Sequence, residues 1–334
     1  MNGKRNRNCS IFRGLFMEKK DAQNTLVTGG AGFIGSHIVD RLIEDGNNVT
    51  VFDNLSSGKM EFLDHHQDNP NFTFIKGDLL NTDEIQNACK DQDLIFHVAA
   101  NPDVRLGASD TKVHFDQNIT ATYNVLEAMR INEVKKIAFT STSTVYGEAT
   151  IIPTPENYGP LVPISLYGAS KLACEALITS YSHTFNMQSW IFRFANVIGN
   201  RGTHGIIVDF IEKLRNDPNN LEILGDGKQS KSYISVTECK DAIMFAIENS
   251  NDEVNIFNIG SEDTTNPTRI GEIIVEEMGL KDVGFSYTGG SRGWKGDVPK
   301  MMLSIDKLKE LGWDLNTGSE DFVRETVKLL LNDC

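Results

Sequence analysis

The segment Thr25-Leu-Val-Thr-Gly-Gly-Ala-Gly-Phe-Ile-Gly35 carries the strongest information about the fold. Its first four residues predict a short buried strand, and apolar residues at helical spacing predict a helix over 33–45, which Gly46 ends. Glycines in a strand-to-helix turn permit positive φ angles and let the backbone approach a phosphate. The free N–H groups at the start of the helix would then bind a pyrophosphate. Taken alone, the glycines are also compatible with a plain tight turn.

Strands and helices alternate after this turn. Further short apolar runs predict strands at 49–52, 72–75, 94–98, 137–140, 189–194 and 255–259, with helices between them that include 120–130 and 165–184. Such alternation is typical of βαβ units. It predicts an α/β fold with a Rossmann-type, doubly wound parallel sheet, whose ligand lies outside the carboxyl ends of the strands.

The pattern changes after Asn196, where glycine-rich segments appear at 225–227 and 289–293. We predict a dinucleotide-binding Rossmann domain over 22–195, to which 232–260 returns. A smaller carboxyl-terminal substrate lobe is expected from 196–231 and 261–334. Residues 1–21 are basic with a broken apolar patch, so we expect a disordered extension, or an upstream start with Met17 as the alternative first residue.

Composition limits the class of protein. The 334 residues are 40% hydrophobic and 23% charged, which permits a sizeable core, and the net charge of −14 disfavours nucleic acid and membrane partners. Five scattered cysteines without a C-x-x-C pair disfavour disulfides and zinc and indicate a reducing cytoplasm. The seven histidines show no metal-ligand spacing, so no metal is expected, and His97 is interpreted as a packed core residue.

Two acids follow predicted strands on the cofactor side. Asp53 ends the second strand about twenty residues after the glycine turn, where an acid accepts hydrogen bonds from the adenosine ribose hydroxyls. A carboxylate there repels a 2′-phosphate, which favours NAD over NADP. Asp78 follows the third strand and is a weaker candidate for the adenine end. The alternatives are an ordinary turn residue at Asp53 and an ordinary loop acid at Asp78.

Two further features predict acid–base chemistry. A hydroxyl run, 140–144, leaves the fifth predicted strand, and Tyr167 and Lys171 share one face of the helix over 165–184. Free tyrosine, with a pKa near ~10, is a poor base at neutral pH, but a neighbouring cation favours the phenolate. The pair would then act as a general base for a substrate hydroxyl. A Tyr-x-x-x-Lys pair alone is common on helix surfaces; the glycine turn, Asp53 and the hydroxyl run strengthen the hypothesis.

Four segments together resemble a known family: Thr28-Gly-Gly-Ala-Gly-Phe-Ile-Gly35, Asp53-Asn-Leu-Ser-Ser-Gly58, Thr144-Val-Tyr-Gly147 and Tyr167-Gly-Ala-Ser-Lys171. The combination is similar to the extended short-chain dehydrogenase/reductases, and within them to the UDP-glucose 4-epimerases. The resemblance runs from about Asn24 to Leu331. It implies an NAD-binding Rossmann domain, a smaller lobe for a UDP-sugar, and commonly a homodimer.

The resemblance implies roles for individual residues. Tyr167 would be the acid–base, Lys171 would position the nicotinamide ribose, and Thr142 would hydrogen-bond the sugar 4-hydroxyl. From resemblance or position, the residues expected to bind NAD are Gly29, Gly32, Phe33, Ile34, Gly35, Asp53, Asn54, Leu55, Ser57, Gly58, Asp78, Leu79, Val98, Ala99, Ala100, Asn118, Tyr167 and Lys171. Those expected to bind the substrate are Thr142, Tyr167, Asn196, Lys231, Arg292 and Asp297.

The chain departs from the family pattern at two cationic positions. Lys231-Ser-Tyr233 stands where relatives often have Arg-Asp-Phe or Arg-Asp-Tyr, and Trp294 stands where they usually have arginine. Lysine lacks the bidentate fork that matches a phosphate. Arg292 and Lys295 flank Trp294, so which cation binds the diphosphate stays open. Met301 lies near the position that limits N-acetyl sugars in the family, but adaptable methionine leaves the choice of sugar open.

The hydroxyl run also bears on the reaction. Relatives that dehydrate the 4-keto sugar carry Thr-Asp-Glu before Val-Tyr-Gly, and those that decarboxylate carry Thr-Ser-Glu, whereas this chain has Thr142-Ser-Thr144. Without a carboxylate, the simplest outcome is epimerisation at C4, with UDP-glucose and UDP-galactose as the favoured pair. The alternatives are a 4,6-dehydratase, a decarboxylase, or a 4-epimerase of UDP-glucuronate or a UDP-N-acetylhexosamine. A non-catalytic NAD-sensing protein would often lack the Tyr–Lys pair.

Overall fold

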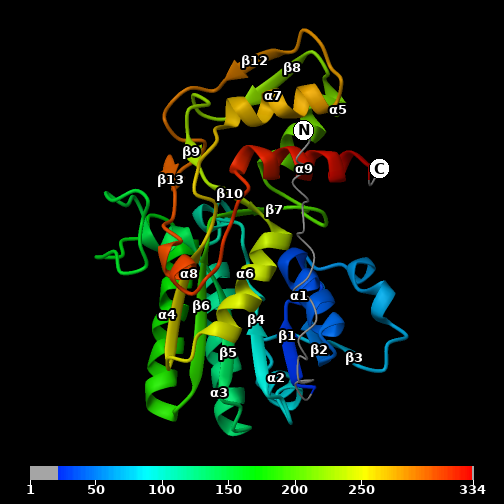
Figure 1. The fold of residues 1–334 in the computed structure, drawn as a ribbon, viewed down its shortest axis with the longest axis vertical. Coiled ribbons are helices and arrows are strands. Elements are labelled where there is room, and N and C mark those ends of the chain that lie inside the picture. The colour runs from blue at the N-terminus through cyan, green and yellow to red at the C-terminus, as the bar shows by residue number, and fades with distance from the viewer. Residues whose placement is uncertain (1–21, 333–334) are drawn as a thin grey trace, which may run out of the picture.

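A parallel sheet of seven strands forms the centre of the computed structural model, which describes residues 22–332 (Figure 1). The strand order is β11 (Val254–Ile259), β6 (Gln188–Phe194), β5 (Lys136–Thr142), β4 (Leu94–His97), β1 (Asn24–Thr28), β2 (Asn48–Asp53) and β3 (Phe72–Lys76). Every predicted strand is present, and every neighbouring pair is parallel. The predicted Rossmann-type sheet is therefore confirmed. The extension predicted over 1–21 lies outside the described residues.

Helices cover both faces of this sheet. One face carries α1 (Phe33–Glu44) and α6 (Val236–Asn249); the other carries α2 (Thr82–Ala88), α3 (Ala121–Ile131) and α4 (Leu166–Phe185). Successive strand residues point to opposite faces. Thus Val27 joins the core cluster beneath α1, while Leu26 joins the cluster beneath α3 and α4. Burial on both faces explains the nearly continuous apolar runs of the strands.

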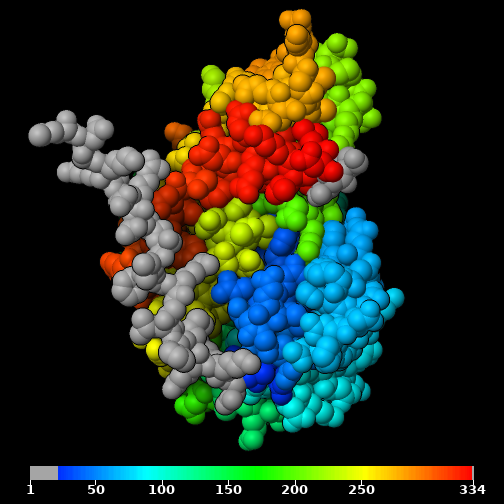
Figure 2. All heavy atoms as spheres, turned by 45° about the vertical axis from the view of Figure 1, so that its right-hand side comes forward, coloured from blue at the N-terminus to red at the C-terminus, as the bar shows by residue number. Residues whose placement is uncertain are grey.

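A second, smaller body of structure follows β6. It contains β7 (Asn196–Ile198), α5 (Ile206–Asn216), β8 (Asn220–Ile223), β9 (Ser230–Lys231), α7 (Pro267–Glu277), β12 (Gly284–Tyr287), β13 (Lys300–Met301) and α9 (Ser319–Asn332). Between these elements, β10 (Tyr233–Ser235) leads back to the main sheet, and α8 (Asp306–Glu310) packs against β11. Phe210, Leu221 and Ile274 lie in its own apolar core. The orange and red surfaces of Figure 2 show α7 and α9 stacked over the blue sheet region.

Between β9 and α7, the chain returns to the main sheet. β10 pairs with β7, α6 packs beside α1, and β11 then pairs with β6 at the sheet edge. The division into 22–195 with 232–260, and 196–231 with 261–334, stays a proposal, and α8, within 261–334, packs against the main sheet. Short 3₁₀ turns complete the chain at η1 (Met60–Phe62), η2 (Asp64–His66), η3 (Leu106–Ala108) and η5 (Ser143–Tyr146), and a π-helix at η4 (Phe115–Thr120). Among the described residues, no helix has the length and apolar character needed to cross a bilayer.

Candidate active site

The glycine turn joins β1 to α1 with no space for larger residues. Gly29 has a φ of +71°, and its N–H donates to the Phe52 carbonyl at 2.9 Å. A Cβ on Gly35 would lie 2.1 Å from the Gly29 carbonyl oxygen, so the helix packs directly against the turn. Gly32 caps α1 without a side-chain hydrogen bond. The first N–H groups of α1 are thus available to an anion, as a dinucleotide pyrophosphate requires.

Asp53 connects the end of β2 to this turn. Its carboxylate is buried and accepts the N–H of Ala31 at 3.0 Å and that of Leu55 at 2.8 Å. Burial raises the pKa of Asp53, and the two backbone hydrogen bonds oppose the rise. The Asn54 amide lies 3.5 Å from an Asp78 carboxylate oxygen. The structure therefore brings the three side chains predicted for the adenosine end together at the carboxyl ends of β2 and β3.

The loop after β4 lies on the other side of the turn. The N–H groups of Val98 and Ala99 both donate to the Thr28 carbonyl, at 3.1 and 3.0 Å. Asn118 is buried in η4, where its Nδ2 donates to Ser170 Oγ at 2.9 Å and its Oδ1 accepts the Asn101 N–H at 2.8 Å. Asn118 thus ties this loop to α4. Single π-turns of this kind frequently occur at functional sites.

Tyr167 and Lys171 lie on the first two turns of α4. The Ser165 hydroxyl caps this helix by accepting the Gly168 N–H at 3.0 Å. A Cβ on Gly168 would lie 2.8 Å from the Thr144 carbonyl oxygen, so the start of α4 packs closely on the hydroxyl run that follows β5. Lys171 is 2% exposed, and its ammonium lies 4.1 Å from the centre of the Phe139 ring.

Burial dominates the proton affinities of this pair. It raises the pKa of Tyr167 to about 12, although a side-chain hydrogen bond with Thr142 lowers it. It also lowers the pKa of Lys171 to about 8, against the effect of the nearby Cys174 and Glu175 side chains. Desolvation thus keeps the Tyr167 pKa high in the chain alone, and the expected lowering by Lys171 and a bound nicotinamide stays a prediction. A phenol with this pKa is a proton donor at neutral pH, and a further positive charge is needed to make it a base.

Sequence reasoning missed a buried polar network beneath this pair. The Ser141 hydroxyl donates to Glu175, and Arg193 donates to Glu175 at 2.7 Å and to the Tyr146 hydroxyl at 2.9 Å. Glu175 and Arg193 are each 4% exposed. Two signals pointed to this network: Glu175 lies one turn after Lys171, and Arg193 interrupts an apolar strand. A buried charge normally has a partner.

The predicted substrate cations lie close to one another: Arg292 is on the loop before β13, and Lys231 belongs to β9, which pairs with β13. Lys231 forms an ion pair with the buried Asp297, and its ammonium lies 5.1 Å from the centre of the Trp294 ring. Arg292 is half-buried and donates to Glu148 at 2.7 Å and to the Asp297 carbonyl. The charge of Lys231 is therefore compensated within the protein. Arg292 is the more exposed of the two cations.

This loop also contacts the segment just before α4, the helix that carries Tyr167. A Cβ on Gly296 would lie 3.3 Å from the Ile164 carbonyl oxygen, just before α4 begins. Asn196, on β7, donates from its Nδ2 to the Ser232 carbonyl at 3.1 Å, next to Lys231. The predicted substrate residues of the second body are thus brought to the start of the helix that carries Tyr167.

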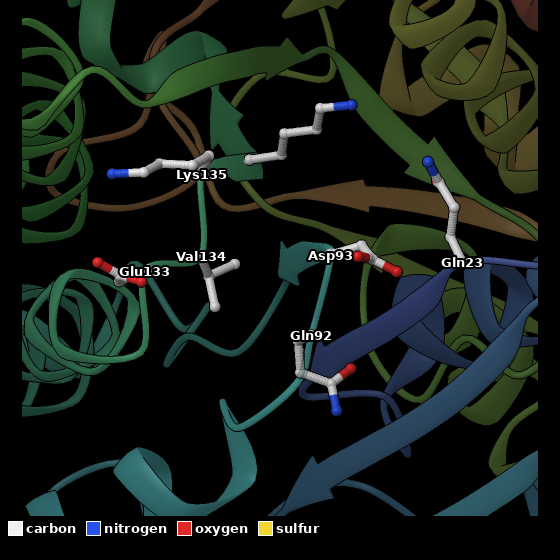
Figure 3. Close-up of a pocket in the computed structure, with 7 residues that line it drawn as sticks. Gln23, Gln92, Asp93, Glu133, Val134 and Lys135 are labelled. Atoms are coloured by element: carbon white, nitrogen blue, oxygen red, sulfur yellow. The ribbon is translucent and has the colours of Figure 1, made fainter.

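His97, predicted as a packed core residue, lies beside the glycine turn, whereas a surface hollow lies at the far end of the strands. His97 is buried, with its ring nitrogens 2.8 and 2.9 Å from the hydroxyls of Thr28 and Thr122, and burial lowers its pKa to about 3. The core interpretation of His97 is confirmed. A surface hollow of about 330 Å³ lies where β1 and β5 begin, at the opposite end of the strands from the glycine turn (Figure 3). It is lined by Gln23, Gln92, Asp93, Glu133, Val134, Lys135 and Lys136.

Comparison with known proteins identifies the family of this chain. The model of the NAD dependent epimerase/dehydratase family matches residues 25–260. A putative UDP-glucose 4-epimerase of Methanocaldococcus jannaschii is 34% identical, over 92% of this chain and 98% of that protein. A solved UDP-galactose 4-epimerase is 40% identical with a TM-score of 0.83, over 93% of this chain and 99% of the other. A UDP-N-acetylglucosamine 4-epimerase from Methanobrevibacter ruminantium is 33% identical with a TM-score of 0.83, over 94% of this chain and 100% of the other.

The chain therefore belongs to the NAD dependent epimerase/dehydratase family. The resemblance to extended short-chain dehydrogenase/reductases and the expected cofactor, NAD, are confirmed at the level of the family. The close packing of the glycine turn, the free amino end of α1 and the Asp53 carboxylate fit this cofactor. Its assignment to individual residues is part of the proposal below.

Gly35→Ala is expected to abolish stable NAD binding and to lower Tm. An added methyl group would lie 2.1 Å from the Gly29 carbonyl oxygen, which must push α1 away from the turn. The cofactor retained by the purified protein, measured by chromatography after denaturation, checks this. Gly284→Ala is the matched control, because its Cβ would lie 3.6 Å from the nearest atom. Retention of NAD by Gly35→Ala at the level of the control would contradict the assigned pyrophosphate site.

Proposed function

We propose that the protein catalyses NAD-dependent epimerisation at C4 of a UDP-sugar, with UDP-glucose and UDP-galactose as its substrate pair. The observation that carries the proposal is the run Thr142-Ser-Thr144 at the end of β5, which contains hydroxyls and no carboxylate. Two acids lie around this run, and each is paired with an arginine: Glu148 with Arg292 and Glu175 with Arg193. Elimination or decarboxylation would need a further unpaired acid–base group beside Tyr167.

In the proposed mechanism, Tyr167 in its phenolate form accepts the proton of the sugar 4-hydroxyl while Thr142 holds that hydroxyl; the positive charges of Lys171 and of a bound nicotinamide would favour that form. When bound, NAD would accept the hydride from C4 and give it back. The phenol then gives its proton back to the 4-oxygen of the transient 4-keto sugar. Return of the hydride to the opposite face of C4 would invert the configuration of that carbon. The proton and the hydride that leave the sugar are both returned, so the sugar undergoes no net oxidation. Lys171 would hold the nicotinamide ribose, and its ammonium favours the phenolate.

Product analysis tests this reaction. The purified protein, incubated with UDP-galactose alone, is expected to give UDP-glucose of identical mass until the two reach equilibrium, as chromatography with mass spectrometry would show. A product that has lost water or, from UDP-glucuronate, carbon dioxide would instead support the dehydratase or decarboxylase alternative. Turnover of UDP-N-acetylglucosamine at a higher kcat/KM would move the proposal to the N-acetylhexosamine. The 33% identical epimerase of that sugar keeps this second candidate open.

We also propose a homodimer in the cytoplasm. Phe115, Tyr123 and Leu166 expose large apolar side chains along the neighbouring η4, α3 and α4, a pattern that suits an interface between subunits. Sedimentation velocity would report the mass of the assembly. The described cysteines Cys89, Cys174 and Cys239 are buried free thiols, which suits a reducing compartment.

A further inference from the structure

Three potential metal ligands converge on the outer side of α1, away from the proposed active site. Asp40 belongs to α1, and His65 and His66 belong to η2. One carboxylate oxygen of Asp40 lies 2.9 Å from His65 Nε2 and 2.8 Å from His66 Nε2. The three ligand atoms all lie within 4.8 Å of one another. Their separation in the sequence hides this grouping, since a His-His pair with an acid 25 residues earlier has no recognised metal spacing.

Surrounding contacts hold these side chains in place. Leu63, which precedes η2, is fully buried in the core beneath α1. The His66 side chain is only 10% exposed and packs against Phe72, with ring centres 5.8 Å apart. His65 is 49% exposed, so it leaves a route to solvent. The group is thus anchored on one side and accessible on the other.

Arg201 orients the carboxylate. It donates to the second Asp40 oxygen at 2.8 Å, which leaves the first oxygen facing the two histidines. Outer partners that fix the orientation of a ligating carboxylate are a regular feature of metal sites. The guanidinium also places a positive charge beside the group, which weakens the binding of any cation.

The donor atoms select a class of metal. Two imidazole nitrogens and one carboxylate oxygen suit Zn²⁺, Ni²⁺ or Cu²⁺ and not Mg²⁺, which prefers oxygen ligands. Ligands bound to one zinc ion at ~2.0–2.1 Å in tetrahedral geometry lie roughly 3.3 Å apart. The contacts between Asp40 and the histidines would have to open by only about half an ångström. Water would supply the fourth ligand, on the exposed side of His65.

We propose that Asp40, His65 and His66 form a binding site for one divalent transition metal ion, with Zn²⁺ as the expected occupant. The ion would fasten the segment 59–67 to α1. Because this segment follows Asn54–Gly58 directly, the ion would also stabilise the loop proposed to border the adenosine. Metal binding itself does not depend on the proposed epimerase activity.

Calorimetric titration of the untagged, chelator-treated full chain with Zn²⁺ tests the site. We expect one Zn²⁺ per chain, no saturable binding of Mg²⁺, and a Co²⁺ complex with visible d–d absorption. His66→Ala and Asp40→Asn should each weaken Zn²⁺ binding at least tenfold. The exposed His183→Ala is the matched control, because it removes a histidine paired with a single carboxylate, Glu253, at 2.8 Å.

Circular dichroism of each metal-free variant checks that it is folded, and His65→Ala serves as a second test because that side chain is exposed. The proposal is overturned if the parent binds less than one Zn²⁺ per chain. It is also overturned if the His65→Ala variant binds Zn²⁺ as tightly as the parent, or if the control loses the ion equally. The three residues would then form only a hydrogen-bonded cluster with Arg201.

Discussion

Tyr167→Phe is expected to lower kcat for UDP-galactose conversion by about 10²–10⁴-fold, the usual contribution of a positioned acid–base group. The variant loses only the phenolic oxygen, so packing against His114, whose ring centre lies 5.7 Å away, is kept. Initial rates at saturating UDP-galactose measure the effect, and KM should change far less than kcat because the ring still fills its place.

Tyr181→Phe is the matched control for this prediction. Tyr181 lies near the other end of α4, where its hydroxyl donates to Glu127 at 2.7 Å, so removing this phenol should leave kcat unchanged. Both variants should retain NAD after purification, which separates a loss of acid–base chemistry from a loss of the cofactor. If Tyr167→Phe turned over as fast as Tyr181→Phe, the proposed mechanism would be wrong.

The cofactor side of the site could be predicted because its signals are local. The glycine turn, the strand before it and Asp53 lie within about thirty residues, and each follows from backbone geometry or from the position of a strand end. The alternation of short apolar runs likewise predicts a parallel sheet, since strands buried on both faces must be apolar throughout. Tyr167 and Lys171 share a helix face by spacing alone.

The substrate side of the site could not be predicted in the same way, because it depends on contacts between residues that are far apart in the sequence. Lys231 and Asp297 are 66 residues apart, and only the folded second body brings them into one ion pair. The pKa of Tyr167 is a related case. The sequence shows the ammonium one turn away, but it does not show how far burial withdraws the phenol from water, which is the largest effect on this pKa in the chain alone.

Glu175→Ala is expected to destabilise the folded protein by about 3–5 kcal/mol, the usual cost of leaving one member of a buried ion pair alone. Arg193 would keep its charge inside the protein without the carboxylate that accepts three of its hydrogen bonds. Urea denaturation followed by circular dichroism measures the change in the free energy of unfolding. The double variant Glu175→Leu/Arg193→Met should recover much of the loss, because apolar residues of similar volume leave no unpaired charge.

The pH dependence of Glu175→Gln separates support of the fold from an electrostatic effect on the site. Glu175 opposes the burial that lowers the pKa of Lys171 to about 8, so removing its charge should lower that pKa further. A reaction that needs the Lys171 ammonium declines as pH rises through this pKa. The alkaline limb of the kcat profile should therefore move to lower pH in Glu175→Gln, while Glu148→Gln, which removes an exposed carboxylate, leaves it in place. If the alkaline limb of the kcat profile did not shift in a folded Glu175→Gln variant, the Glu175 carboxylate would contribute only to the fold and not to the pKa of Lys171.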